Sequence, residues 1–475
     1  MKKKQIIKYI SIIFSLSLSR LIYGVPMEIP NYIKNNFTSM DDAGVLLNRS
    51  REYFEEQRLS KELKEEKIKN RTRIENSDIS KLQETPEGEI KFMLKGFQFS
   101  PSEVLTTEEL NKIIEPYLKS EVSVNDLYRV VNEINTLYQK KGYIVCRAGL
   151  PPQTIENGIV KIVLVEGKTG RVLIQGNNST KGNYIRERID LDMGTVSNLN
   201  ELNKSLVWFN GSNDVQLRIE LTAGALPGTT DYILTVYEPK KHTGVIFADN
   251  SGAETSGEYR LGASYVNSSL FGYRDQFSIS AVGSDGTTAG SFAYSFPISK
   301  KGTRLGLNYS LSNVEIVDGP LKDVDIEGES SSYGVSLTQP FVVNEIRKIE
   351  GILEFNKQNS KTDFMGFPWV DDEITRYTAG VAITTFGDSY VWYNRHNISK
   401  GSWDSLSGET KDYMKYDTSF VLQKMFRETQ MLNVRFNGQY AFDDYLPSTD
   451  QFYVGGHTLF GDILKALWEL TMEFH

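Results

Sequence analysis

Two kinds of hydrophobic spacing divide this chain. Between residues 90 and 238, apolar residues recur at helical spacing in some segments and form short continuous runs in others. From His242 onward, apolar and polar residues alternate at every second position, in segments separated by Gly, Asp, Asn and Ser. The first pattern predicts small mixed α+β domains, and the second predicts a series of antiparallel strands.

The first mixed domain is expected over residues 90–167. Its clearest element is a helix from Ser123 with one apolar face, made of Leu127, Val130, Val131, Ile134, Leu137 and Tyr138. Gly142 ends this helix. Two strands follow, and the connection between them is Leu150, Pro151, Pro152 and Gln153. Cys146 is expected in the first of these strands, as a small core residue.

A strand and a shorter helix are expected before that helix. The strand is predicted over Ile90–Gly96. A capping box of Thr106 and Glu109 begins the shorter helix, which is predicted to reach Tyr117. The order of elements in this domain is therefore β-α-α-β-β.

The same order is expected a second time, over residues 168–240. The predicted strands are Arg171–Gln175, Asp214–Thr222 and Thr230–Tyr237, and the predicted helices are Asn183–Asp190 and Asn198–Phe209. The two domains are therefore predicted to be tandem copies of one unit. Each copy has an exposed sheet edge, which is what pairing with an extended peptide requires.

The alternating segments are expected to form a membrane β-barrel over residues 241–458. They are Glu258–Asn267, Gln276–Gly283, Arg304–Leu311, Tyr333–Gln339, Ile352–Lys357, Thr375–Thr384, Ser389–Arg395, Asp417–Leu422 and Leu432–Ala441. Such alternation, with tyrosines near strand ends, is typical of membrane barrels, although a soluble β-sandwich alternates as well. Small or polar residues on the face that a sandwich would bury favour the barrel.

Residues 1–24 are expected to be an export signal, which also favours the barrel. Lys2–Lys4 give a basic start, and Ile10–Leu18 is an apolar run too short for a bilayer span of about 20 residues. Residues 40–69 are predicted to form one long charged helix with a thin apolar stripe, and residues 70–89 a polar linker. Composition leaves two interpretations of the helix open: a solvated helix or arm, or a helix that lies in a polar channel.

Composition argues against several functions. A net charge of -8 disfavours a nucleic-acid partner, and a single cysteine excludes an intramolecular disulfide. The four histidines lack metal-ligand spacing, and the sequence has no CxxC, HExxH or GxSxG motif. Gly283–Gly290 is predicted to be a loop, and Asp371, Asp372 and Glu373 a solvated loop rather than a calcium site. No enzyme activity, metal or cofactor is therefore expected.

The segment GYIVCRAGLPPQTIENGIVKIVLVEG resembles the first POTRA domain of two-partner secretion transporters, the haemolysin and haemagglutinin transporter family. The residues that carry this resemblance are Gly142, Tyr143, Leu150, Pro151, Pro152, Gln153, Gly158, Glu166 and Gly167. Three later segments also resemble the family. They are Phe247–Gly262 (the first barrel strand and hairpin), Tyr294–Ile298 (the turn after the second strand) and Phe452–Thr458 with Gly455 and Gly456 (the start of the sixth extracellular loop).

The resemblance implies a plug helix (residues 40–69), a linker, two periplasmic POTRA domains and a sixteen-stranded antiparallel barrel in the outer membrane. It also implies a monomeric pore, surrounded by outer-membrane lipid, that secretes one large partner exoprotein of the haemolysin or filamentous haemagglutinin kind. The N-terminal secretion domain of that partner would bind the POTRA edges. The alternatives are a barrel-assembly insertase of the same superfamily, a porin or adhesin, and a non-functional truncated product.

Residues 459–475 depart from the family pattern. The family's sixth loop carries a Val-Arg-Gly-Tyr/Phe motif, whereas here His457 and Thr458 are followed by a segment with the spacing of an amphipathic helix. With suitable synonymous codons, the same DNA read one base earlier encodes IVRGYFKGSLGIDNGIS, which contains the motif. We therefore expect a frameshift near residue 458, and an incomplete barrel of about eleven strands whose edges could not close in lipid.

Overall fold

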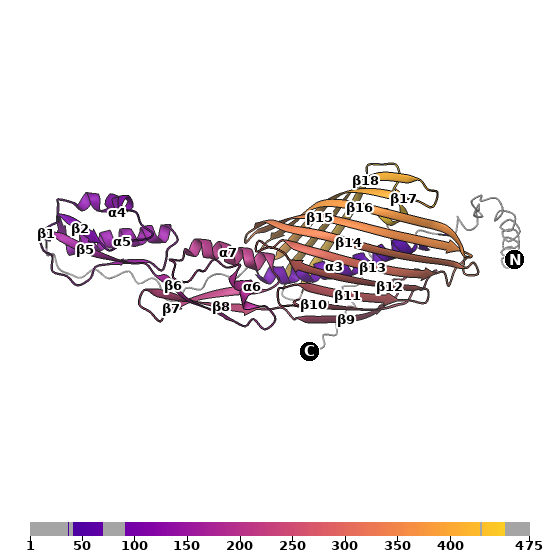
Figure 1. Ribbon diagram of the computed structural model, residues 1–475, viewed down its shortest axis with the longest axis horizontal. Coiled ribbons are helices and arrows are strands. Elements are labelled where there is room, and N and C mark those ends of the chain that lie inside the picture. The colour runs from indigo at the N-terminus through magenta and orange to yellow at the C-terminus, as the bar shows by residue number, and fades with distance from the viewer. Residues whose placement is uncertain (1–36, 38–40, 70–90, 428–429, 452–475) are drawn as a thin grey trace.

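The computed structural model describes residues 37, 41–69, 91–427 and 430–451. Two small α+β domains follow one another and lead to a large curved sheet, with helix α3 (Ala43–Lys69) inside its curve (Figure 1). None of the described helices is both long and apolar enough to cross a membrane. The predictions for residues 1–24, 70–89 and 459–475, and for Gly455 and Gly456, lie outside the described residues.

The first domain packs two helices against one face of a small mixed sheet. The sheet order is β2 (Gly96–Phe99), β5 (Ile159–Val165) and β4 (Arg147–Gly149), and β1 (Lys91–Met93) pairs separately with β3 (Glu121–Ser123). The helices are α4 (Thr107–Ile114), continued by the 3-10 turn η2 (Glu115–Tyr117), and α5 (Val124–Lys140). The apolar face predicted for α5 lies in the core between helices and sheet.

Two details of this domain correct the sequence predictions. The single strand predicted over Ile90–Gly96 is wrong, because the chain turns from one sheet to another between β1 and β2. The Leu94 amide donates to the Ser120 carbonyl (3.0 Å), whereas the next amide donates to the Gly158 carbonyl (2.8 Å). Cys146 lies one position before β4 rather than within a strand, although its side chain is fully buried in the core.

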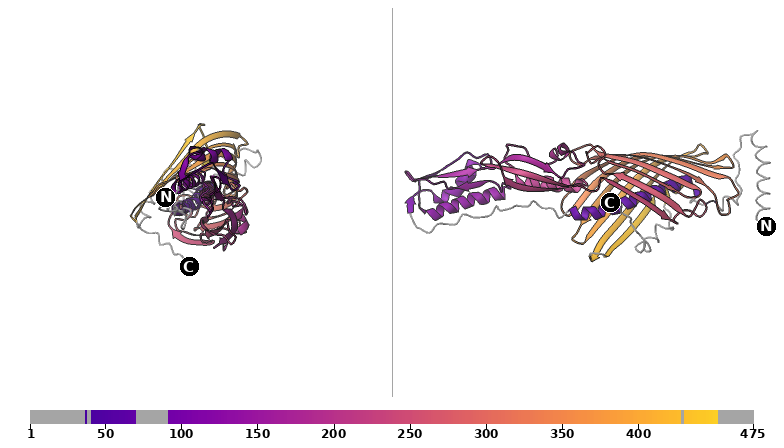
Figure 2. Two further views of the ribbon diagram at one scale, coloured as in Figure 1. Left: turned by 90° about the vertical axis from the view of Figure 1, so that its left-hand side faces the viewer. Right: turned by 90° about the horizontal axis from the view of Figure 1, so that it is seen from below.

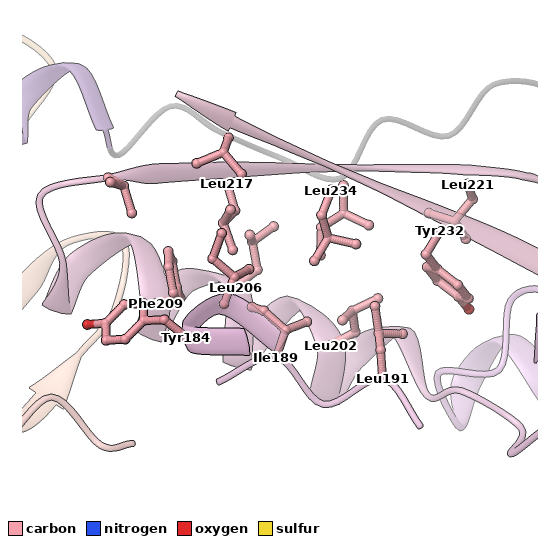
Figure 3. Close-up of a cluster of buried hydrophobic side chains, with 14 of the residues drawn as sticks. Tyr184, Ile189, Leu191, Leu202, Leu206, Phe209, Leu217, Leu221, Tyr232 and Leu234 are labelled. Carbon is pink, nitrogen blue, oxygen red and sulfur yellow. The ribbon is translucent and has the colours of Figure 1, made fainter. Parts of the chain in front are cut away.

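The second domain has the order of the first without the β1–β3 pair. Its elements are β6 (Lys168–Gln175), α6 (Gly182–Arg186), α7 (Leu199–Ser212), β7 (Gln216–Ala223) and β8 (Thr229–Tyr237), with the sheet order β6-β8-β7. Leu202, Leu206 and Phe209 of α7 pack against the inner face of this sheet (Figure 3). The predicted β-α-α-β-β order is therefore present in the second domain, and in the first domain the additional short pair β1–β3 interrupts it.

Eleven antiparallel strands form the large sheet, and each pairs with the next along the chain. They are β9 (His242–Asp249), β10 (Arg260–Asn267), β11 (Gln276–Gly283), β12 (Thr287–Pro297), β13 (Arg304–Glu315), β14 (Ile326–Val343), β15 (Arg347–Phe364), β16 (Phe367–Phe386), β17 (Tyr390–Asp404), β18 (Thr410–Arg427) and β19 (Gln430–Ala441). Among the described residues, β9 and β19 each have a single strand neighbour, so the barrel is incomplete.

The two faces of this sheet differ in chemistry. Large apolar side chains are exposed on the outer face, for example Leu307 and Tyr309 of β13 and Tyr333 of β14. The inner face, toward α3, buries small polar side chains, namely Ser310, Ser312, Ser330, Ser332, Gln358, Ser360 and Thr362. This arrangement of apolar outside and polar inside is that of a membrane barrel.

Three predictions for the sheet are wrong in detail. Tyr294–Ile298 is not a turn after the second strand: all but its last residue belong to β12, the fourth strand. Gly290, predicted to be in a loop, pairs with Ala281 and Leu311 inside the same strand. Asp371, Asp372 and Glu373 lie in β16, where Glu373 forms an ion pair with Lys357 of β15 (2.5 Å). Cross-strand pairing thus accommodates charges that the sequence pattern assigns to a loop.

Candidate functional sites: the inner face of the barrel sheet and the POTRA motif

Helix α3 begins against a polar pocket on the inner face. The Asp42 carboxylate accepts from the amides of Gly44 (2.7 Å) and Val45 (3.3 Å), as an N-cap does, and also from the Ser448 hydroxyl (2.7 Å). A Cβ at Gly44 would lie 2.5 Å from the Thr449 side chain and 2.8 Å from the Ser360 hydroxyl. The close approach of helix and sheet therefore requires glycine at this position.

The small polar side chains of the inner face bind the first turn of the helix. The Ser312 hydroxyl donates to the Ala43 carbonyl (2.9 Å), and the Gln358 amide donates to the Gly44 carbonyl (3.3 Å). Further along, Arg435 of β19 pairs with Glu56 (2.5 Å). The helix thus contacts the sheet through polar groups along much of its length, which explains why its apolar stripe is thin.

A second, charged cluster holds the 3-10 turn η3 (Ser448–Asp450) next to the helix. The buried Asp450 carboxylate pairs with Arg376 of β16 and Lys415 of β18, and it accepts a hydrogen bond from Tyr413. The Thr449 carbonyl accepts from the Asn48 side chain of α3 (2.9 Å). Two cations and a hydroxyl offset the cost of burying this carboxylate, so η3 links the helix to the wall of the sheet.

Glu166 organises the start of helix α4 in the first domain. Its carboxylate accepts from the Ser102 hydroxyl, the Glu103 amide (2.7 Å) and the Tyr138 hydroxyl (2.8 Å). Burial raises the pKa of Glu166, but the hydrogen bonds from Ser102, from two main-chain amides and from Tyr138 lower it further, and the net pKa lies below its usual value. The carboxylate is therefore held in its charged form.

Two motif glycines occupy backbone conformations that other residues rarely adopt. Gly142 has φ +88°, and a Cβ there would lie 2.4 Å from the Asn198 side chain of the second domain. Gly158 has φ +70°, and its Cβ would lie 2.4 Å from the Met93 carbonyl oxygen. Gly142 therefore sets the spacing between the two domains, and Gly158 the spacing between β5 and the first strand.

The other motif residues shape the connection between β4 and β5. The Gln153 side chain donates to the Lys161 carbonyl (2.7 Å) and accepts from the Lys161 amide (2.7 Å). Beyond the end of β4, it therefore makes the hydrogen bonds to β5 that a longer β4 would make. Leu150 packs against the core, and Pro151 and Pro152 follow it. Near the helix end, the Tyr143 carbonyl accepts from the Cys146 amide (3.0 Å), while Gly167 lies against the Val145 carbonyl.

The second domain is fixed to the large sheet by an ion pair between a buried arginine and a partly exposed aspartate. Arg274, in the turn between β10 and β11, is almost fully buried and donates from Nε to Asp214 of the second domain (2.7 Å). The Lys181 amide donates to the Gly272 carbonyl in the same turn (2.8 Å), and Arg188 donates to the Ser299 carbonyl (3.1 Å). The right-hand view of Figure 2 shows the resulting row of two domains and sheet from below.

Sequence reasoning missed Asp450, Arg376 and Lys415. They lie far apart along the chain, and no local spacing marks them.

Burial raises the pKa of the Cys146 thiol to about 11, so this cysteine is protonated at neutral pH. Among the residues that the structure describes, no group of three or more His, Cys, Asp or Glu side chains could hold a metal ion.

Comparison with known families agrees with this architecture. The ShlB-type POTRA domain matches residues 92–167. The family described as haemolysin secretion/activation protein ShlB/FhaC/HecB matches residues 228–458. The chain belongs to the two-partner secretion transporter family. Members of this family lie in the outer membrane with their POTRA domains in the periplasm, and this two-partner secretion transporter has the same location.

Individual relatives support this assignment. The heme/hemopexin transporter protein HuxB of Haemophilus influenzae is 26% identical over 388 residues, which cover 77% of this chain and 68% of HuxB. The outer membrane transporter CdiB of Dickeya dadantii is 28% identical over 190 residues, covering 40% of this chain and 34% of CdiB. The solved structure of CdiB from Escherichia coli has the same fold, with a TM-score of 0.58 at 18% identity over 86% of this chain and 79% of that chain.

Proposed function

We propose that this two-partner secretion transporter exports one large exoprotein, with a β-rich N-terminal secretion domain, of the haemolysin or filamentous haemagglutinin kind. The observation that carries the proposal is the placement of α3 on a polar inner face, next to two POTRA domains whose sheets have open edges. Main-chain hydrogen bonds at such an edge supply affinity for an extended chain, and alternate side-chain contacts supply specificity.

In this proposal, residues 40–69 act as a plug. Many of its contacts with the sheet are hydrogen bonds and ion pairs, which water replaces at modest net cost. Leu63 also packs against Val391 and Val421 of the sheet. Departure of the helix from the inner face would break these polar contacts and would also expose a few buried apolar side chains, among them Val45, Leu47 and Leu63. Folding of the exoprotein outside the cell would drive its passage. The barrel-assembly alternative is not favoured, because the matched relatives are two-partner secretion transporters.

Secretion of the partner is the test. The gene is deleted, and exoproteins in the culture medium and on the cell surface are compared with those of the parent strain. We expect the loss of one large exoprotein, encoded beside the transporter gene, and its return on complementation. Unchanged secretion of every large exoprotein, together with reduced levels of other outer-membrane barrels, would instead support an insertase.

A further inference from the structure

The edges of the two POTRA sheets differ in whether they can pair with an added strand. In the first domain, Asn135 of α5 lies beside β4, the edge strand that follows this helix. The Ala148 amide donates to Asn135 Oδ1 (2.7 Å), and Asn135 Nδ2 donates to the Ala148 carbonyl (3.3 Å). All three residues of β4 lie opposite residues of β5. Main-chain groups of successive residues point to opposite sides of a strand, so Ala148, whose groups bind Asn135, carries the outward main-chain groups of this edge.

In the second domain, an asparagine at the equivalent place makes the same pair of hydrogen bonds to an edge strand. The Leu217 amide, near the start of β7, donates to Asn210 Oδ1 of α7 (2.7 Å), and Asn210 Nδ2 donates to the Leu217 carbonyl (3.0 Å). Here the strand has eight residues and continues for six beyond Leu217. The asparagine therefore closes only the start of β7, whereas Asn135 closes all of β4.

Residues after β4 extend the closure in the first domain. Pro151 and Pro152 lack main-chain N–H groups and cannot donate to an added strand. Beyond them, the Gln153 side chain binds both main-chain groups of Lys161, the β5 position that an extended β4 would cover. This whole side of the sheet is thus closed to strand addition by Asn135, two prolines and Gln153.

The opposite edge, β2, is open as far as the described residues go. Its single strand neighbour among the described residues is β5. The amides of Gly96 and Ser100 donate to carbonyls of the segment that contains β5 (3.3 and 3.2 Å), so the main-chain groups of Phe97 and Phe99 point away from it. The rings of Phe97 and Phe99 lie on one face with centroids 6.1 Å apart, both half-buried, while Gln98 is exposed on the other.

We propose that the first POTRA domain accepts an extended segment of the exoprotein at β2 only, and that Asn135 excludes it from β4. The inference rests on the proposed function and specifies its binding edge. The segment that fits has alternating chemistry, with apolar side chains toward Phe97 and Phe99 and polar side chains toward Gln98. Such alternation is the pattern of a chain that will fold into β-structure after export.

A strand-forming peptide tests the edge without knowledge of the natural partner. The probe is a peptide of alternating valine and threonine with terminal lysines. Its control is the same peptide with alternate main-chain nitrogens methylated, which removes the donors on one edge. The full chain is purified in detergent with the photo-reactive amino acid benzoylphenylalanine at Gln98 of β2 or, as a matched control, at Arg147 of β4. Cross-linked peptide is located by mass spectrometry.

We expect cross-linking from Gln98 that falls about tenfold or more with the methylated peptide, and none from Arg147. In the Asn135→Ala background, cross-linking from Arg147 should appear. Asn135→Asp, which keeps the acceptor for the Ala148 amide, provides a second variant if Asn135→Ala fails to fold. Cross-linking from Arg147 with Asn135 intact, or none from Gln98, would overturn the inference. Either result leaves the secretion test of the proposed function untouched.

Discussion

At the residue scale, several residues of the family motif each have a structural role that another residue type could not easily take over. Glu166 joins the end of β5 to the segment before α4 through hydrogen bonds from Ser102, Glu103 and Tyr138. Gly142 and Gly158 have positive φ and close neighbours, and Gln153 stands in for a strand. The motif is therefore a set of structural requirements of the first POTRA domain, on which its edges depend.

Glu166→Gln should remove a pH-dependent contribution to stability. Because the folded-state pKa is lowered, this contribution is fully present above the unfolded-state pKa, near 4.5, and is lost as the pH falls through the folded-state pKa. We expect a local loss of about 1–3 kcal/mol at neutral pH and a flatter acid dependence. Hydrogen exchange of residues 102–110 as a function of pH measures it. Glu103→Gln, on an exposed ion pair with Lys168, is the control and should change little.

Gly142→Ala should loosen the joint between the POTRA domains. The added Cβ meets the Asn198 side chain, which donates to the Lys141 carbonyl (2.9 Å), and positive φ adds a cost of about 1–2 kcal/mol. Gly194→Ala is the matched control, since Gly194 has φ +82° but open space around it. We expect faster hydrogen exchange at the start of α7 in the first variant than in the control. Equal rates would mean that backbone strain alone matters.

At the element scale, α3 and the two POTRA domains are positioned by polar contacts of different strength. The first turn of the helix accepts hydrogen bonds from serine and glutamine side chains of the sheet. Asn48 of the helix donates to the Thr449 carbonyl, next to the charged cluster around Asp450. The second POTRA domain is joined to the sheet by Arg274, whose buried guanidinium pairs with the partly exposed Asp214. Removal of one partner of a buried pair costs more than loss of an exposed contact. Both the helix and the joint of the second POTRA domain therefore depend on polar contacts with the sheet.

Gly44→Ala should release the first turns of α3 from the inner face. Its Cβ would overlap the Thr449 and Ser360 side chains, and overpacking of this kind costs about 1–3 kcal/mol. Alanine also raises intrinsic helix propensity, so a rise in hydrogen exchange over residues 45–50 would report undocking rather than a weaker helix. Gln57→Ala, at an exposed position of the same helix, is the control. Unchanged exchange in Gly44→Ala would show that the helix shifts without cost.

At the scale of the whole molecule, the sheet needs further strands to close. The outer face of β9–β19 is apolar, but β9 and β19 each have one strand neighbour among the described residues. In lipid, each unsatisfied main-chain group costs several kcal/mol. The described strands alone would therefore leave the main-chain groups of two edges, β9 and β19, unpaired in lipid.

The 475-residue polypeptide is compared with one in which further strands can pair with the edges of β9 and β19 and so complete a heat-modifiable barrel in outer membranes. A version whose DNA is read one base earlier after Thr458, with the Val-Arg-Gly-Tyr motif restored and the following strands included, should give one. Gel mobility of heated and unheated membranes compares the two. The hypothesis fails if sequencing shows that the codons cannot encode the motif in that frame, or if the version read in that frame gives no heat-modifiable barrel.

The sequence alone determined the elements whose signals are local. Helical spacing fixed α5, a capping box fixed the start of α4, and period-two alternation predicted most strands of the sheet and their apolar face. The same local reasoning failed at Leu94, where the chain changes sheets, and at Asp371–Glu373, where cross-strand partners allow charges inside a strand. The pattern of residues along one segment does not reveal which residues of other segments lie next to it in the fold.

Only the tertiary structure decided the sites. Asp450 reaches Arg376, Asn48 reaches Thr449, and Asn135 closes β4, although each pair is separate in sequence. Side-chain hydrogen bonds of this kind depend on distance and direction in space, which hydrophobic periodicity does not specify. The sequence therefore determined that the chain has two POTRA domains and a barrel-type sheet, and the folded structure decided which edges are open and what holds the helix.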